Sequence, residues 1–300
     1  MNRGLVLALF VLALVAALPK TSFCQSNDGF GAFGIKKFAF VTGPGSFFAP
    51  HEDIWILDTL KSKPRRLAEG VTAVWSPDGQ MIAYCAHEGW GTKHIVLGQM
   101  QVINADGSGH AQLTNIPGGA CPVDWSAHGK RIGSSAGVLL LDKGLRVANV
   151  LHGAVGIWSP DETKLIFSKY RENRQSSGSI WVADADGANP RKVIEDNSEV
   201  ISPCWSPDGE SILFSSHRDN KDRSEIFRVK LDGTGLEKIA ADEKWSLVNP
   251  AISPDGQYLV VTAYGGSVDS SIVLLDLSGH SRTVLARGVH AKASILWDKR

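Results

Sequence analysis

Short apolar runs recur along this chain, and each follows a tight turn. Four of them are separated by polar segments: Met81–Tyr84, Leu165–Phe167, Ile212–Phe214 and Tyr258–Val261. Short apolar runs that are bounded by turn residues are typical of β-strands. The pattern of apolar and polar positions therefore predicts an all-β protein.

The turns before these runs share one sequence. Trp75-Ser76-Pro77-Asp78-Gly79 recurs unchanged at 205–209, with one change at 158–162 and 252–256, and in degraded form at 125–129. The copies start 50, 33, 47 and 47 residues apart, which is close to the length of one propeller blade. Proline presets φ for the turn, and glycine tolerates positive φ. We expect the Trp before each turn to pack between neighbouring repeats.

Each repeat continues in the same order after its apolar run. A polar loop is followed by a third strand, then by an Asp-Gly turn such as Asp186-Gly187, and then by a fourth strand such as Arg191–Ile194. The expected third strands are Ile180–Ala183, Ile226–Val229 and Ile272–Leu275. Strand, turn, strand, loop, strand, turn and strand make up one four-stranded blade.

The two ends of the chain complete each other. Phe38–Val41, Asp53–Leu57 and Arg65–Leu67 form a blade that lacks its first strand, while Ile295–Asp298 resembles a first strand with no blade after it. Pairing the C-terminal strand with the N-terminal blade closes the ring and removes its open sheet edges. The fold class that we predict is a six-bladed β-propeller of four-stranded blades over residues 35–300.

This order of elements resembles the TolB-like β-propeller repeat. The resemblance rests on the Trp-Ser-Pro-Asp-Gly turn, the apolar strand after it, the strand that begins Ile-Trp at 180–183 and Ile-Phe at 226–229, and the Asp-Gly turn. TolB carries a further α/β domain before its propeller. The resemblance implies the propeller module alone, without that N-terminal domain.

The first 24 residues are typical of a signal peptide. Arg3 supplies a positive charge, and Leu5–Leu18 is an apolar run that is short for a membrane span. Cleavage after Cys24 is our main expectation, while lipidation at Cys24 and an uncleaved anchor are two alternatives. All three predict a periplasmic or secreted protein.

The composition limits the partners. Lys and Arg number 31, as do Asp and Glu, so the chain has no net charge to collect nucleic acid. We expect no nucleic acid ligand, no membrane span in the mature chain, and a monomer. Cys85, Cys121 and Cys204 show no CxxC spacing and match neither a disulfide framework nor a zinc site. They are interpreted as small buried residues, with one oxidised pair of unknown identity as the alternative.

The turns are expected to lie on one face of the ring and the longer loops on the other, where propellers usually bind their ligands. Polar, charged and aromatic side chains gather in these loops and suit a peptide or carbohydrate ligand. The candidate binding residues are His87, Glu88, Tyr170, Arg171, Glu172, His217, Arg218 and Asp219. The same loops hold Phe47, Phe48, His51, Glu52, Trp90 and His94.

Two functions compete at this face. The first is a non-catalytic scaffold that binds a protein or peptide of the cell envelope, or a glycan, without a cofactor. The second is a sugar lyase or hydrolase that uses the same His, Tyr, Arg and Glu side chains. A metal held by His87, His94 and His217 is disfavoured because these residues do not occupy equivalent blade positions, and no G-x-S-x-G elbow is present. We therefore predict no catalytic residue and no metal.

The third blade departs from the pattern. It runs from Cys121 to Leu151, and its turn at 126–129 has lost the proline. The segment 133–137 leaves almost no loop on the expected binding face. We expect a gap in the rim of the ring at this blade.

Overall fold

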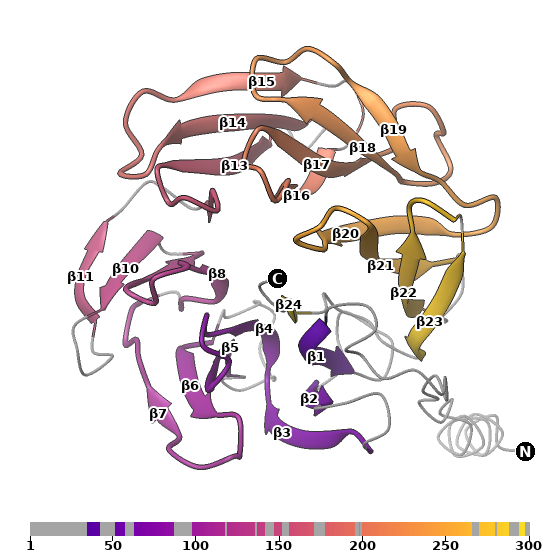
Figure 1. Ribbon diagram of the computed structural model, residues 1–300. Helices are drawn as coiled ribbons and strands as arrows, with labels where there is room; N and C mark the ends of the chain where they lie inside the picture. Colours follow the sequence, from indigo (N-terminus) through magenta and orange to yellow (C-terminus); the bar gives the residue numbers. More distant parts are fainter. Residues whose placement is uncertain are drawn as a thin grey trace, which may run out of the picture.

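The computed structural model describes residues 35–42, 52–57, 63–86, 98–117, 119–135, 137–141, 147–151, 156–170, 178–195, 198, 200–265, 270–279, 281–287 and 294–297. Within these ranges the chain forms strands and no helix. The strands make six four-stranded antiparallel sheets, which surround a common axis as the blades of a propeller (Figure 1). The predicted fold class is confirmed, and the predicted signal peptide lies outside the described residues.

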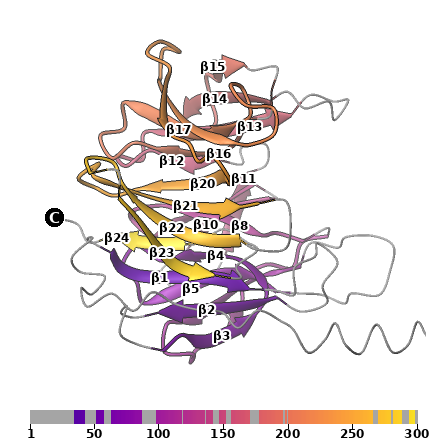
Figure 2. The same cartoon turned by 90° about the vertical axis from the view of Figure 1, so that its right-hand side faces the viewer.

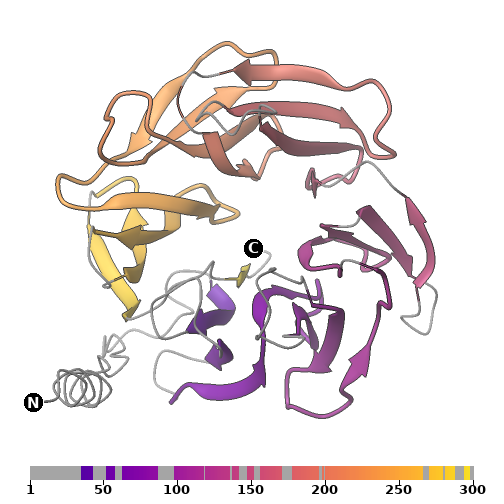
Figure 3. The same cartoon turned by 180° about the vertical axis from the view of Figure 1, so that it is seen from behind.

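The strands of each blade follow one another from the axis outward, as Figures 1 and 3 show from the two sides of the ring. Blade 1 consists of β24 (Ser294–Trp297), β1 (Ile35–Thr42), β2 (Asp53–Leu57) and β3 (Arg65–Glu69). Blade 2 consists of β4 (Val71–Trp75), β5 (Met81–Cys85), β6 (Met100–Asn104) and β7 (Ala111–Gln112). Blade 3 consists of β8 (Pro122–Trp125), β9 (Arg131–Ser134), β10 (Gly137–Leu141) and β11 (Val147–Leu151).

The other three blades repeat this order. Blade 4 consists of β12 (Ile157–Trp158), β13 (Lys164–Tyr170), β14 (Gly178–Asp184) and β15 (Arg191–Glu195). Blade 5 consists of β16 (Val200–Trp205), β17 (Ser211–Ser216), β18 (Glu225–Lys230) and β19 (Glu237–Ala240). Blade 6 consists of β20 (Ser246–Ile252), β21 (Tyr258–Tyr264), β22 (Ser270–Asp276) and β23 (Arg282–Arg287).

The ring closes as predicted. β24 pairs with β1 in antiparallel register, with Ile295 opposite Phe38 and Ser294 opposite Ala39. Phe38 and Ala39 are fully buried. The last described strand of the chain is thus the innermost strand of the first blade, and the sheet edge of β1 is covered.

The Ser-Pro-Asp-Gly turns form a repeated hydrogen-bond unit. In blade 2, Ser76 Oγ donates to Asp78 Oδ1 at 2.6 Å, and the same oxygen accepts the N–H of Gln80 at 2.9 Å. Gly79 has a φ of 71°, which favours glycine. The turns of blades 4, 5 and 6 repeat the Ser–Asp bond at 2.6, 2.5 and 2.6 Å. The role of the turn sequence is therefore architectural.

The Trp side chains before these turns fill the spaces between blades, as predicted. Trp75, Trp125, Trp158 and Trp205 are 5–7% exposed. The indole of Trp205 packs into an apolar cluster with blade 4 and donates to the carbonyl oxygen of Ile157 at 2.9 Å. Each of these indoles contributes apolar burial that joins two otherwise separate sheets.

A disulfide joins two blades. Cys85 at the end of β5 and Cys121 directly before β8 are buried and bonded, with their Cα atoms 4.8 Å apart. The interpretation of the cysteines as small buried residues without a bond does not hold for this pair. Cys204 in β16 is a thiol.

Blade 3 has the short connection that the sequence predicted. Ser134 of β9 pairs directly with Gly137 of β10, so that two residues join the strands. The corresponding loops of blades 2 and 4, at 87–97 and 171–177, lie outside the described residues. The gap in the rim therefore stays a prediction.

None of the described segments is a helix with the length and apolar character needed to cross a bilayer.

Candidate functional site

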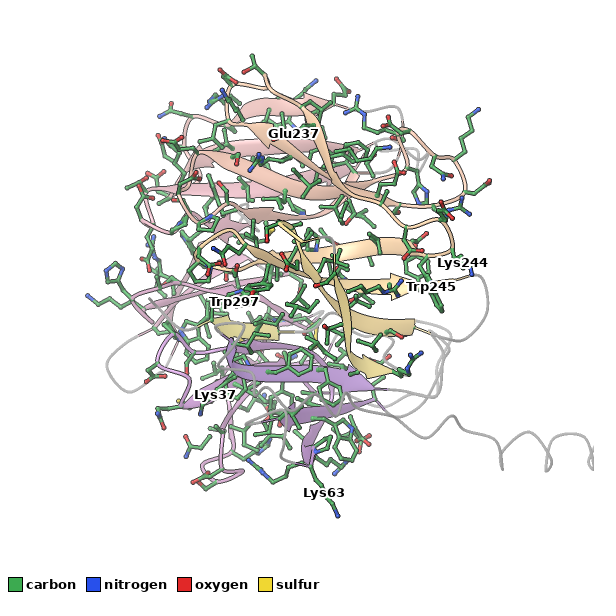
Figure 4. All side chains as sticks on the ribbon, turned by 45° about the vertical axis from the view of Figure 1, so that its right-hand side comes forward. Lys37, Lys63, Glu237, Lys244, Trp245 and Trp297 are labelled. Atoms are coloured by element: carbon green, nitrogen blue, oxygen red, sulfur yellow. A yellow bond between two sulfur atoms is a disulfide. The ribbon has the colours of Figure 1, made fainter. Side chains whose placement is uncertain are left out.

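The propeller presents two different faces. Because the strands of a blade run alternately in opposite directions, its connections lie alternately at the two ends of the strands (Figure 2). We call the face with the Ser-Pro-Asp-Gly and Asp-Gly turns the turn face, and the opposite one the loop face. Figure 4 shows Trp297 and Lys37 toward the turn face, and Lys244 and Trp245 at the opposite edge of the ring.

Three of the predicted binding residues are described in full, and they come from one loop. His217, Arg218 and Asp219 lie between β17 and β18 on the loop face. Tyr170 is the last residue of β13, but its side chain is outside the described part. The other four predicted residues, His87, Glu88, Arg171 and Glu172, also lie outside it.

His217 is anchored at the boundary between blades 5 and 6. Its Nε2 lies 2.9 Å from the hydroxyl of Ser224, a fully buried residue directly before β18. The backbone of Ser224 in turn bonds to blade 6, because its N–H donates to Ser246 Oγ at 3.2 Å and its carbonyl accepts the N–H of Leu247 at 2.8 Å. The position of the imidazole is therefore fixed by two blades.

Arg218 and Asp219 extend from this anchor into solvent. The backbone N–H of Arg218 donates to Ser216 Oγ at 3.2 Å, and its guanidinium lies 5.6 Å from the ring centre of Phe227. Asp219 pairs with the ammonium group of Lys238 at 3.1 Å, and this group also pairs with Glu225 at 2.9 Å. The hydrogen bonds that its ammonium group donates to Glu225 and Asp219 raise the pKa of Lys238. The loop thus presents a positive side chain, Arg218, and a negative one, Asp219, and both are held by neighbouring residues.

Two side-chain nitrogen atoms of this loop are buried without a hydrogen-bond partner among the described residues. They are Nδ1 of His217 and Nε of Arg223. An unsatisfied buried polar atom costs about 1–3 kcal/mol, and such atoms are rare in native proteins. The loop of blade 5 therefore contains buried hydrogen-bonding groups that the described fold leaves unused.

Glu52 is a second loop-face residue with altered chemistry. It precedes β2, and its carbonyl oxygen accepts the N–H of Gly70 at 2.8 Å. Burial raises the pKa of its carboxyl group. Sequence reasoning placed Glu52 in the loop set but did not choose it as a binding residue.

The innermost strands contain a feature that sequence reasoning missed. Thr72, Ser202 and Asn249 have φ values of 50–53°, and each lies three residues before the Trp or Ile of its turn motif. Each marks a shift in strand register. Left-handed backbone is unfavourable for a β-branched residue such as threonine. The common offset from the turn motif is the sequence signal that could have identified them.

These inner positions connect neighbouring blades around the axis. Ser202 Oγ donates to Asn249 Oδ1 at 2.7 Å between blades 5 and 6. The N–H of Trp158 donates to Asp124 Oδ2 at 3.0 Å between blades 4 and 3. The described contacts hold the inner strands together. Among the described residues, no three His, Cys, Asp or Glu side chains are grouped as a metal site.

The known proteins that this chain is similar to share its fold. Residues 145–296 match the family model of the TolB beta propeller domain. No curated protein matches the chain significantly. The crystal structure of TolB from Acinetobacter baumannii has a TM-score of 0.65 at 18% identity, over 89% of this chain and 69% of that chain.

Other similar structures differ in function. A chain of the nidogen/laminin complex has a TM-score of 0.58 at 10% identity, over 88% of this chain and 99% of that one. The tricorn protease has a TM-score of 0.57 at 17% identity, over 78% of this chain and 24% of that one. At these identities the likeness shows the fold alone, and a propeller hosts both binding and catalysis.

Proposed function

Because this chain belongs to the family of TolB beta propeller domains, we propose that it is an exported, non-catalytic scaffold that binds a protein or peptide partner on its loop face. The binding residues in this proposal are those predicted from the sequence, with His217, Arg218 and Asp219 as the described part. Residues 1–24 act as the signal peptide.

The observation that carries the proposal is the pair of unsatisfied atoms at blade 5, His217 Nδ1 and Arg223 Nε. The Arg223 atom is an N–H donor and requires an acceptor, while the imidazole nitrogen takes either role according to its tautomer. A peptide backbone carries both an N–H and a C=O group in every residue. Both atoms are buried, so a peptide strand on the loop face satisfies them once the side chains that cover them move aside.

The surroundings of these atoms also suit a polar partner. Arg218 and Asp219 directly follow the anchored histidine and are exposed, and Lys238 is held by two carboxylates, Asp219 and Glu225. Ordered charges of both signs favour specificity and orientation of a partner.

The disulfide supports the exported location. Cys85 and Cys121 lie in different blades and are bonded, and such bonds persist in oxidising compartments such as the periplasm. The apolar N-terminal run is consistent with the same route.

The test is a crosslinking pull-down from envelope extract with the mature protein. We compare wild type with a His217→Ala/Arg218→Ala variant, and expect the main crosslinked partner to be lost. Lys230→Ala is the matched control, since Lys230 lies at the turn-face end of β18, the strand that begins beside this loop. Recovery of the same partners in equal amounts by the double variant contradicts the proposed face.

A further inference from the structure

The boundaries between consecutive blades are filled in a regular way, and one of them departs from the rule. At each boundary the residue before the Ser-Pro-Asp-Gly turn of the later blade packs against the earlier blade. We call this space a junction pocket. Trp75, Trp125, Trp158 and Trp205 fill four such pockets and are buried. At a fifth, Trp297 packs against a cluster formed by residues of blades 1 and 6. At the boundary of blades 5 and 6 the residue is Ile252, which is only half-buried.

Strand register identifies the walls of each pocket. Between blades 4 and 5, Trp205 packs in one cluster with Ile166, Val182 and Val193. Ile166 lies opposite Ile157, the residue before Trp158, and opposite Val182 on the next strand. In blade 5, Cys204 is the residue before the motif Trp, Leu213 lies opposite Cys204, and Arg228 lies opposite Leu213 on the next strand. Leu213 and Arg228 are therefore the counterparts of Ile166 and Val182.

The counterpart residues of blade 5 surround a groove on the turn face. Its volume is about 660 Å³, within the range of about 300–1,000 Å³ that is usual for ligand pockets. Its walls include Leu213, Arg228, Ile239 and Ile252, and its mouth lies between the turns at 206–208 and 254–256. The groove is thus the junction pocket of blades 5 and 6, in which isoleucine replaces the indole found elsewhere.

The groove also carries a cation suited to an aromatic ring. In two filled pockets a basic side chain of the earlier blade lies over the indole, since Arg131 is 5.0 Å from the ring centre of Trp158 and Lys37 is 5.3 Å from that of Trp75. Arg228 is held in place by Glu237, whose carboxylate accepts its Nε–H at 2.7 Å. A guanidinium over a ring stabilises it by cation–π attraction.

We propose that this groove is a second binding site, which takes the side chain of a tryptophan presented by a partner protein. The partner's indole lies between Leu213, Ile239 and Ile252, with Arg228 against its face. The chain's own indoles occupy the equivalent positions in the other junction pockets. The site opens on the turn face, and one residue that lines it, Lys238, also pairs with Asp219 of the loop-face site. We choose tryptophan as the ligand because tryptophan side chains of this protein fill the equivalent spaces between other blades.

The experiment uses N-acetyl-L-tryptophanamide as the probe and methyl NMR of the mature protein as the readout. Titration is expected to shift the methyl signals of Leu213, Ile239 and Ile252 in wild type. N-acetyl-L-leucinamide, which is apolar but lacks a ring, is expected to leave them in place at the same concentrations. Absence of shifts with the tryptophan probe up to its solubility limit overturns the proposal, as does an equal response to both probes.

Two variants locate the site. Ile252→Trp fills the groove from within and is expected to weaken probe binding at least tenfold, as followed through the methyl signals of Leu213 and Ile239. Arg228→Ala removes the cation and is expected to weaken binding severalfold while keeping the apolar walls. The loop-face variant His217→Ala/Arg218→Ala is expected to bind the probe as wild type does. Unchanged binding by a folded Ile252→Trp protein overturns the proposal, and loss of binding in the loop-face variant does so too.

Discussion

Two boundaries between blades depart from the repeat, and they do so with opposite results. At blades 3 and 4, the turn of blade 3 has Ala127 and His128 in place of proline and aspartate, and the turn of blade 4 has Glu162 in place of glycine. At blades 5 and 6, Ile252 replaces tryptophan. The first set of changes is compensated by new contacts, and the second leaves a groove.

The contacts at blades 3 and 4 join the altered positions to each other. The carboxylate of Glu162 accepts the backbone N–H of His128 at 2.6 Å and pairs with Arg131 at 2.5 Å. Arg131 in turn lies over the ring of Trp158. Glu162 adopts a φ of 57°, a left-handed conformation that costs a non-glycine residue about 1 kcal/mol or more. The contacts with His128 and Arg131 hold Glu162 in this conformation.

The comparison separates two meanings of a degraded repeat. Where a replaced side chain finds new partners in the neighbouring blade, the change belongs to the architecture. Where the replaced side chain leaves space, as at Ile252, the position is open to a ligand. Four variants or conditions test this distinction.

The largest expected effect is at a filled junction. Trp205→Ala removes a buried indole and its hydrogen bond to Ile157, and we expect it to lower the free energy of unfolding by about 3–5 kcal/mol. Ile252→Ala, at the open junction, is expected to cost less than about 2 kcal/mol because its side chain is only half-buried. Urea unfolding measures both. Equal losses at the two positions would falsify the difference between the junctions.

The next effect is at the compensated junction. Glu162→Ala leaves Arg131 and the N–H of His128 without their shared acceptor, and we expect a loss of about 2 kcal/mol. Glu210→Ala is the matched control, since this exposed glutamate follows the equivalent turn of blade 5, and it is expected to change stability by less than about 0.5 kcal/mol. If Glu162→Ala is as neutral as its control, the two changes in the motif are unrelated.

Much of this fold could be predicted from the sequence, because its turns carry local signals. Pro77, Asp78 and Gly79 act within one turn, and the spacing between the copies of this turn along the chain predicts the order and number of the blades. The closing strand at 294–297 was also predictable, since the first blade lacked one strand. The turn signals depend on residues near each other in the chain, whereas the closing strand was found by counting the strands of the first blade.

The missed features depend on contacts between blades. The bond of Cys85 to Cys121 crosses from blade 2 to blade 3, and no spacing rule indicates such a pair. Glu162 looked like a single lost glycine until its contact with His128 was visible. Ile252 looked like a conservative apolar change, because the volume that it leaves open is enclosed by residues of another blade.

A smaller effect is expected when the open junction is filled. Ile252→Trp restores the indole of the repeat, and filling an existing space usually stabilises a protein by about 0.5–2 kcal/mol. We expect a gain of about 1 kcal/mol, measured by urea unfolding, because Arg228 has to adjust to the ring. Ile252→Leu keeps the volume nearly constant and is expected to stay within about 1 kcal/mol of wild type. A loss of stability in Ile252→Trp would show that the groove cannot take an indole from within.

The smallest expected effect is the pH dependence of the compensated junction. Burial alone would raise the pKa of Glu162, but hydrogen bonds from His128 and Arg131 outweigh it, and the pKa lies below its ordinary value. The stabilisation by the carboxylate is therefore present above the unfolded-state pKa and is lost as pH falls through the lower, folded-state pKa. Glu162→Gln keeps an acceptor for His128 but no charge, so the stability difference between wild type and this variant should shrink as the pH is lowered through that range. Variants at the open junction, such as Ile252→Leu, should differ from wild type by a constant amount over the same range, because no ionisable group is changed there. A difference for Glu162→Gln that is equally independent of pH would mean that the charge of Glu162 does not hold the two altered turns together.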